Sequence, residues 1–238
     1  MAANSNQNGP LRLASYNIRK AVGLDSRRDP VRTLDVIAEL KADIVALQEA
    51  DKRLGRRAPV LRAVAIAEQT GMRPLTVAEN GHSLGWHGNA LLVRPGIKVR
   101  DVTRLPLPGL EPRGAIMAEL ITPHGPLTVI AAHLGLRRKD RFLQSRAILK
   151  ALDNAPTTSA IVLGDMNEWR PIGGLAPFHD ALQLVAPGHS FHATVPLAPL
   201  DRFALGGLEM HNAGVSETKL ARRASDHLPV WIDVHLQP

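Results

Sequence analysis

The chain has 238 residues, a formal net charge of +7 at pH 7 and a sequence pI near 10.3. This length suits one large α/β unit, and a hydrophobic content of 45% provides a core that needs no covalent staples. The chain contains no cysteine, which excludes disulfides, thiolate metal sites and a cysteine nucleophile.

The amino terminus carries no recognisable targeting signal. Residues 1–10 are Asn-rich and uncharged, and they lack the apolar stretch of a signal peptide. No run elsewhere approaches the roughly 18 apolar residues of a membrane span. We therefore expect a disordered tail over residues 1–10, a single domain over residues 11–238, and a cytoplasmic protein, with an exported form as the open alternative.

The positive charge favours a polyanionic partner, because Lys and Arg side chains that neutralise phosphates release condensed counterions. A basic pI also occurs in proteins that touch no nucleic acid, so charge alone leaves both alternatives open. Aromatic residues make up only 3% of the chain. That leaves little material for the base-stacking platform of a dedicated single-strand binder.

In the first half of the chain, apolar strand-like runs alternate with helical stripes. Asp29-Pro30 is typical of a helix start, because Asp caps the backbone N–H groups and Pro suits the first turn. Gly71 is typical of a helix end. The predicted elements are a strand at 11–18, a helix at 29–40, a strand at 43–47, a helix at 58–70, and strands at 74–78, 89–94, 97–105 and 114–121.

The second half of the chain ends mainly in strands. Its predicted elements are a strand at 127–133, a helix from 137 to about 153, a buried strand at 161–163, a short helix within 178–184, and strands at 200–205 and 225–236. Alternating strands and helices followed by strands suit two packed mixed sheets flanked by helices.

The buried strand at 161–163 stops abruptly at Gly164, and Asp165 and Asn167 follow with one residue between them. Both side chains should therefore emerge on the same side of the strand end, where open α/β sheets place their chemistry. Taken alone, the pattern also fits a strand that ends in turn-forming residues, which Asp and Asn often are.

The same junction of an apolar run with polar side chains recurs four more times. It presents Asn17, Glu49, His133 and the pair Asp226-His227. Random strand ends would not favour these residue types so consistently. The sequence therefore predicts a hard-metal and acid/base site assembled from many strands.

The segments SYNIR, ALQEAD, GNALLVR, AAHL, GDMNEW, LDRF and SDHLPV occur in that order along the chain. In this order they resemble the endonuclease/exonuclease/phosphatase superfamily of deoxyribonuclease I-like hydrolases, from Leu11 to Val234. GDMN and SDHLPV are specific in combination, whereas SYN and QE alone are weak. The resemblance implies a four-layer α/β sandwich with two packed mixed β-sheets flanked by helices.

Glu49, Asn17 and Asp226 offer oxygen ligands, which Mg²⁺ or Mn²⁺ prefers. Magnesium keeps several waters and takes few protein ligands. One strong acid, Glu49, supported by two weaker or water-mediated contacts is therefore sufficient, and the resemblance assigns Glu49 the same role.

The resemblance also implies roles around a scissile phosphate. Asp165 accepts a proton from the attacking water, and Asn167 orients that water or holds a phosphate oxygen. His227 faces the phosphate while Asp201 holds its other ring nitrogen, so either Asp165 or His227 can be the general base. His133 protonates the leaving oxygen or binds the phosphate, and the presence of His rather than Tyr here disfavours abasic-site repair. Each of these histidines alone could be a hydrogen-bonded structural residue.

Basic residues gather near the predicted site. Arg113 lies where the family places an Arg, and it is a candidate for a phosphate contact or an internal salt bridge. The loop after Asn17 and the run 137–141 are rich in Lys and Arg. They are interpreted either as solvated faces or as rims that steer a polyanion.

Three functions compete. The first is a metal-dependent phosphodiester hydrolase that acts on DNA or RNA, a nuclease. The second is the same chemistry on a phospholipid headgroup or a small phosphoester. Residues 198–200 lack the Trp-Cys pair of inositol-polyphosphate phosphatases, and no apolar aromatic hairpin typical of sphingomyelinases is evident. The third, a silent phosphate-binding scaffold, is disfavoured because every polar strand-end residue is present. We expect a monomer without a stable protein partner.

Overall fold

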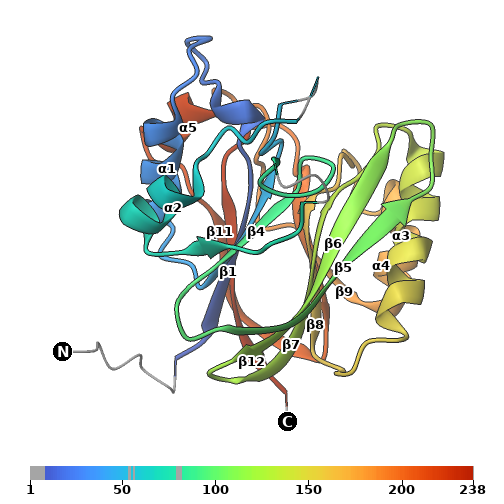
Figure 1. Cartoon of the computed structure of the whole chain (residues 1–238). Coiled ribbons are helices and arrows are strands. Elements are labelled where there is room, and N and C mark those ends of the chain that lie inside the picture. The colour runs from blue at the N-terminus through green and yellow to red at the C-terminus, as the bar shows by residue number, and fades with distance from the viewer. Residues whose placement is uncertain (1–8, 53–54, 56, 79–81, 238) are drawn as a thin grey trace.

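The computed structural model describes residues 9–52, 55, 57–78 and 82–237. Apart from residues 9 and 10, the expected tail lies outside the described residues. Two six-stranded sheets pack face to face, with helices on the outer face of each (Figure 1). The expected architecture of two mixed sheets flanked by helices is therefore confirmed.

The first sheet holds both chain termini of the fold and is mixed. Its strand β1 (Leu11–Asn17) pairs in parallel with β2 (Ile44–Gln48) and antiparallel with β12 (Val230–Leu236). The strand order is β11 (Leu208–Val215), β12 (Val230–Leu236), β1 (Leu11–Asn17), β2 (Ile44–Gln48), β4 (Ala90–Val93) and β3 (Arg73–Pro74). The helices on its outer face are α1 (Pro30–Glu39), α2 (Ala63–Thr70) and α5 (Ala221–Ala224) (Figure 1).

The second sheet has the order β5 (Lys98–Leu107), β6 (Arg113–Thr122), β7 (Gly125–His133), β8 (Ala160–Asp165), β10 (Asp201–Gly206) and β9 (Gln183–Val185). Only β7 and β8 run parallel, and α3 (Arg138–Leu152) connects them, as a parallel crossover requires. The short helix α4 (Ala176–Ala181) lies beside α3 on the outer face (Figure 1).

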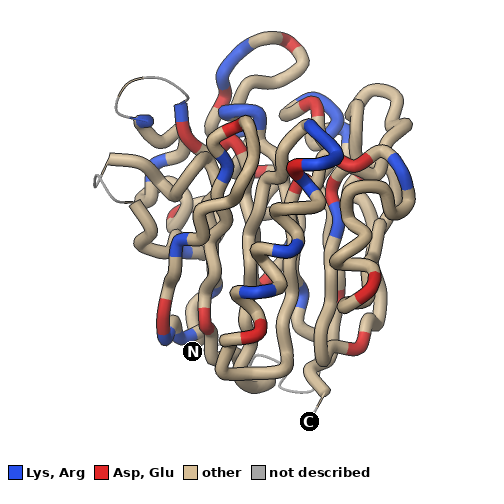
Figure 2. Tube along the Cα trace, turned by 90° about the vertical axis from the view of Figure 1, so that its right-hand side faces the viewer, with Lys and Arg blue, Asp and Glu red and all other residues tan. Residues whose placement is uncertain are grey.

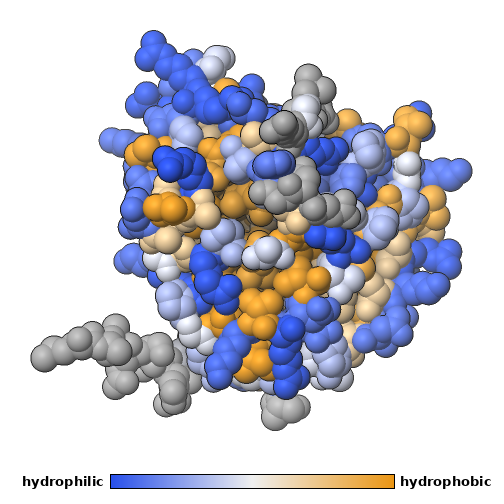
Figure 3. All heavy atoms as spheres, in the orientation of Figure 1, coloured by the Kyte–Doolittle hydropathy of each residue, from blue (hydrophilic) through white to orange (hydrophobic). Residues whose placement is uncertain are grey.

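The main core lies between the two sheets. Leu13, Ile44, Val129 and Leu163 come from the central strands of both sheets and are fully buried in one cluster. These strands are covered on both faces, which explains why their sequences are nearly continuous apolar runs. Where the sheet edges meet, hydrophobic residues form a band down the middle of the molecular face in Figure 3.

Helix boundaries follow local chemistry. The Asp29 side chain accepts a hydrogen bond from the Arg32 backbone N at 3.0 Å and caps α1. Gly71 ends α2 with a φ of 67°, a left-handed conformation that glycine adopts without steric cost. Both signals were readable in the sequence.

Several elements differ from the sequence prediction. The short helix expected within 178–184 is α4, which ends at Ala181, and the strand β9 follows it. The helix expected from residue 58 begins at Ala63, because Val60 and Leu61 are buried loop residues that imitate a helical stripe. The strand expected at 74–78 is reduced to β3, while β11, a largely exposed and bulged edge strand, was missed. The last strand begins at Val230, after Pro229, so Asp226 and His227 precede it.

Among the described residues, no helix combines the length and the apolarity needed to cross a membrane.

Candidate active site

Strand ends of both sheets meet at one end of the molecule. In the second sheet, Asp165 at the end of β8 is the register partner of both His133 on β7 and Asp201 on β10. In the first sheet, β12 runs antiparallel to β1, so the residues before β12 lie beside Asn17 at the end of β1. The Asn17 Nδ2 donates to Asp165 Oδ2 at 3.0 Å and joins the two sheets.

Asp165 lies at the centre of the site and is only 1% exposed. Its Oδ2 is 3.3 Å from His133 Nε2 and 3.7 Å from His227 Nε2. Its Oδ1 accepts the backbone N–H of Asn167 at 3.0 Å. One carboxylate therefore organises an amide and two imidazoles from three other segments of the chain.

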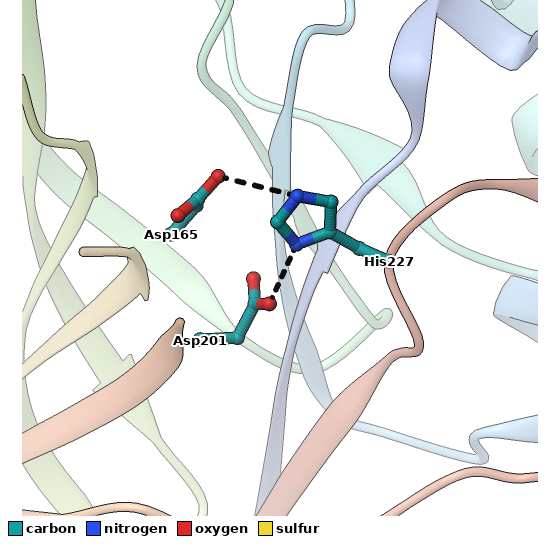
Figure 4. A group of neighbouring side chains, drawn as sticks. All are labelled: Asp165, Asp201 and His227. Carbon is teal, nitrogen blue, oxygen red and sulfur yellow. Dashed lines mark hydrogen bonds and ion pairs between the residues drawn. The ribbon is translucent and has the colours of Figure 1, made fainter. Parts of the chain in front are cut away.

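The His227 ring lies between the carboxylates of Asp165 and Asp201 (Figure 4). Its Nδ1 is 2.8 Å from Asp201 Oδ2, which also accepts the Ser190 hydroxyl at 2.6 Å. Burial opposes a charge on the ring, but the negative charges of Asp201, Asp165 and Asp226 outweigh it and raise the pKa of His227 to about 10. The ring is therefore an imidazolium at neutral pH, with N–H groups on both sides.

Asn167 adopts a φ of 49°, a left-handed conformation in which Asn is tolerated better than most residues. This conformation turns its side chain back, so that Nδ2 donates to the Leu134 carbonyl at 2.9 Å. Glu49 also has a positive φ, at 54°. Such backbone outliers concentrate at functional sites, where the surrounding structure holds them in place.

The three residues predicted to bind a metal are each engaged by the loop after β1. Glu49 forms an ion pair with the Lys20 ammonium, and Asp226 lies 3.4 Å from the Arg19 guanidinium. The Asn17 Oδ1 accepts the Arg19 backbone N–H at 3.1 Å. The loop thus supplies a positive charge beside both carboxylates and a backbone N–H to the amide.

Glu49 and His133 line one pocket of about 350 Å³. Arg113 lines it as well, and its guanidinium forms a 2.8 Å ion pair with Glu111. The salt bridge considered for Arg113 is therefore present, and the same side chain borders the pocket. Other charged or polar side chains of the lining are Lys20, Asp51, Lys52, Arg57, His87 and Glu111.

Several residues of the site were not singled out from the sequence. Ser190 holds Asp201 from a loop that shows no periodicity. Arg202 is 1% exposed, and its guanidinium donates to the carbonyls of Glu168 and Arg170, which fixes the loop after Asn167. The only signal for Arg202 in the sequence was its position directly after Asp201 in the LDRF segment. His87 also lines the pocket.

A second donor cluster could also hold a metal ion. Asp165, Asp201 and His227 each offer one ligand atom, and these atoms lie within 4.8 Å of one another. The His227 Nδ1 already shares a proton with Asp201, and Asp165 Oδ2 accepts from Asn17. These hydrogen bonds favour a proton-handling role for the cluster, which leaves Glu49 as the most accessible acid.

The chain was compared with known proteins. It is 25% identical to the uncharacterized protein YbhP of Escherichia coli K12 over 94% of this chain and 96% of that protein. A mannosyl-6-phosphatase of Bacteroides thetaiotaomicron VPI-5482 has a similar structure, with a TM-score of 0.73, 18% identity, and coverage of 94% of this chain and 99% of that one. So does D. rerio TDP2 complexed with single strand DNA product, with a TM-score of 0.69, 16% identity, and coverage of 94% and 98%.

These structural likenesses concern the fold. The family model of the endonuclease/exonuclease/phosphatase family matches residues 14–227, a range that begins within β1 and ends at His227 and so includes all the strand ends of the site. The chain belongs to the endonuclease/exonuclease/phosphatase family, whose members hydrolyse phosphoesters.

Proposed function

We propose that this protein is a divalent-metal-dependent phosphodiester hydrolase in which water attacks phosphorus. The observation that carries the proposal is the chain of contacts from Asp201 through His227 to Asp165, which continues to His133 and Asn17. It combines a carboxylate base, a fixed cation and a second imidazole around one point. These are the groups that in-line displacement at a phosphodiester needs.

Asp165 is proposed as the general base. With a pKa of about 10, His227 already carries its proton at neutral pH and cannot accept another. Its role is instead to stabilise negative charge on the phosphate in the transition state. Asp165 takes the proton of the attacking water, and Asn167, whose backbone contacts Asp165, helps to orient that water.

His133 is proposed to act on the leaving group. Its Nε2 lies 3.3 Å from Asp165, and its ring also lines the pocket. A proton on this nitrogen can pass to the leaving oxygen as the phosphorus–oxygen bond breaks. Arg113 borders the same pocket and can contact a phosphate oxygen if its pair with Glu111 opens.

Glu49, Asp226 and Asn17 would hold the metal. Their donors are hard oxygens, which suits Mg²⁺ or Mn²⁺, and the Glu49 side chain is 28% exposed at the pocket wall. The ammonium of Lys20 already balances Glu49, so this position accommodates positive charge. A divalent ion bound there would neutralise phosphate charge and polarise phosphorus toward attack.

Nucleic acid is the first candidate substrate. Lys and Arg are frequent in the loops at the upper end of Figure 2, the end that carries the site, and such charges bind a phosphate backbone. One relative in fold was captured with single strand DNA product. A phospholipid headgroup or small phosphoester is the second candidate, because the pocket of about 350 Å³ is close to the smallest ligand pockets.

Hydrolysis with and without Mg²⁺ or Mn²⁺ tests the proposal. The substrates are plasmid DNA, RNA, bis(p-nitrophenyl) phosphate, p-nitrophenyl phosphate and phospholipid vesicles. Glu49→Gln should lower metal-dependent turnover by at least about 10²-fold, whereas the exposed control Glu209→Gln on β11 should not change it. Full activity of Glu49→Gln would contradict the metal assignment, and turnover that needs no metal would contradict the reaction class.

A further inference from the structure

Large apolar side chains are exposed around the mouth of the site. Leu110, Leu136, Trp169, Val195 and Leu197 are between 61% and 71% exposed. Each lies in a loop at the strand ends that carry the site: before β6, after β7, after β8 and before β10. Single exposed apolar residues are ordinary, but a group on one rim marks an interaction surface. We call these five residues the apolar rim.

The first half of the apolar rim, Leu110 and Leu136, is held by two acidic side chains. The backbone N–H of Leu110 donates to Asp140 Oδ2 at 3.2 Å, and that of Leu136 donates to Glu111 Oε1 at 3.1 Å. Both loops are therefore tied down by hydrogen bonds to carboxylates. The side chains of Leu110 and Leu136 nevertheless point into solvent, so both are exposed on a backbone that is held in place.

The second half begins with Trp169, which is connected to the catalytic residues through aromatic contacts. The Trp169 ring lies 6.2 Å from the Phe191 ring, which lies 4.9 Å from the His227 ring. Phe191 therefore links this part of the apolar rim to the imidazolium of the site.

The loop that carries Val195 and Leu197 is fixed by its own backbone. The Leu197 N–H donates to the Phe191 carbonyl at 2.7 Å, and the Val195 N–H donates to the His192 carbonyl at 2.9 Å. These bonds close the loop next to Phe191. The two halves of the apolar rim thus flank the site, and both are held in place.

Exposed cations accompany the apolar rim. Arg137, Arg138 and Lys139 follow Leu136 directly, and Arg170 follows Trp169. None of the ion pairs formed within the described residues involves these four side chains. The neighbouring acids Asp140 and Glu168 are buried and already hydrogen-bonded inside the protein. The surface around the apolar rim therefore combines apolar side chains with uncompensated positive charge.

This combination selects one class of partner. A nucleic acid backbone would use the cations but would leave the leucines and valine in water. A small soluble phosphoester would bind in the pocket and would contact neither the apolar rim nor its cations. An anionic lipid surface uses both, because apolar side chains enter the interface while Lys and Arg pair with lipid phosphates.

We propose that the apolar rim and its cations dock this protein on an anionic phospholipid surface, with the pocket facing the headgroups. The proposal favours a phospholipid headgroup within the second substrate class. Only catalysis at that surface rests on the proposed function. Docking itself requires no turnover, so the two can fail independently.

Vesicle co-sedimentation of the full chain tests the docking. The vesicles are phosphatidylcholine alone and phosphatidylcholine with phosphatidylglycerol. We expect binding to the anionic vesicles that weakens with salt, and at least roughly tenfold weaker binding by Leu136→Ser/Leu197→Ser. The matched control, Val64→Ser/Met210→Ser, changes exposed apolar residues on α2 and β11 and should bind like the unmodified protein. Thermal unfolding of both double variants establishes that they are folded.

The docking proposal is overturned by no binding to anionic vesicles, by equal binding to neutral vesicles, or by equal loss of binding in the control variant. Binding to DNA that depends on the apolar rim, with vesicles ignored, would also overturn it and favour the nuclease. Glu49→Gln should still sediment with the vesicles. Vesicle binding without any phosphodiester hydrolysis would therefore contradict the proposed function and leave the docking surface in place.

Discussion

Replacing Asp201 by Asn tests how the buried carboxylate controls His227. Asp201 is fully buried, and its Oδ2 accepts from both His227 Nδ1 and Ser190 Oγ. An Asn side chain has nearly the same shape, so packing is retained. The negative charge disappears, however, and an amide NH₂ facing Nδ1 would favour the opposite tautomer of the ring.

The Asp201 carboxylate controls the proton affinity of the His227 ring. A rise of the His227 pKa from 6.5 to about 10 corresponds to about 5 kcal/mol of preference for the charged ring, at about 1.36 kcal/mol per pH unit. Burial opposes this charge, and Asp201 makes the largest of the contributions that favour it. Losing the Asp201 charge lowers the pKa of His227 and favours the wrong tautomer, so the ring no longer offsets negative charge in the transition state. The loss of one such electrostatic contact costs about 3 kcal/mol, or roughly 10²-fold in kcat.

The assay is kcat on bis(p-nitrophenyl) phosphate between about pH 5 and 10, with urea unfolding to measure stability. Asp201→Asn should lower kcat roughly 10²-fold at about pH 7.5 and move the alkaline limb of the profile toward neutral pH. Ser190→Ala is the matched control, because it removes one hydrogen bond to the same oxygen and keeps the charge. A folded Asp201→Asn protein with kcat within about threefold of the unmodified protein and an unmoved alkaline limb would refute the reasoning.

Two further predictions concern stability. Because the pKa of His227 is raised in the folded state, the charged ring stabilises the fold fully below about pH 6.5, and this stabilisation is lost as pH rises through about 10. The free energy of unfolding, measured by urea denaturation, should therefore fall more steeply between about pH 7 and 10 than in His227→Gln. The difference should reach up to about 5 kcal/mol. Arg141→Met should cost about 3–5 kcal/mol, because it leaves Glu168 buried without its 2.8 Å ion pair, whereas the exposed Arg146→Met on the same helix should cost under about 0.5 kcal/mol in the same titration.

The sequence was most informative where strands are buried on both faces. The runs before His133 and Asp165 are apolar without interruption, because β7 and β8 lie between the core and the outer helices. A polar side chain at the end of such a run stands out, and the parallel register of β7 and β8 places these two residues side by side. Local pattern and tertiary position therefore agree at this part of the site.

The pattern was less informative before β12. Asp226 and His227 were predicted to lie at the start of a strand over residues 225–236, but the strand begins at Val230 and both residues precede it. They reach the same end of the molecule because β12 runs antiparallel to β1. A single sequence gives no strand direction for an isolated apolar run, so this placement depended on the pairing of residues far apart in the chain.

Contacts made by loops could not be predicted. Ser190 reaches Asp201, and Lys20 reaches Glu49, across turns that show no periodicity. The apolar rim is assembled from four loops between residues 110 and 197, so no window of the sequence contains it. No single segment of the sequence is therefore an apolar hairpin, although the folded chain exposes apolar side chains together at the mouth of the site.

The charges of the site explain why a cation should control substrate binding. Asp165, Asp201, Asp226 and Glu49 supply four negative charges, while protonated His227, Arg19 and Lys20 supply three positive ones. One net negative charge remains, and the other charged side chains of the pocket, Lys52, Arg57 and Arg113 against Asp51 and Glu111, add one net positive charge. The site is therefore close to neutral toward a phosphodiester, which is itself an anion, and the proposed divalent cation would make it positive. Metal should therefore tighten the binding of an unreactive diester analogue in the unmodified protein, and calorimetric titration of the analogue with and without Mg²⁺ measures this; equal affinity in both conditions would show that the fixed cations alone suffice.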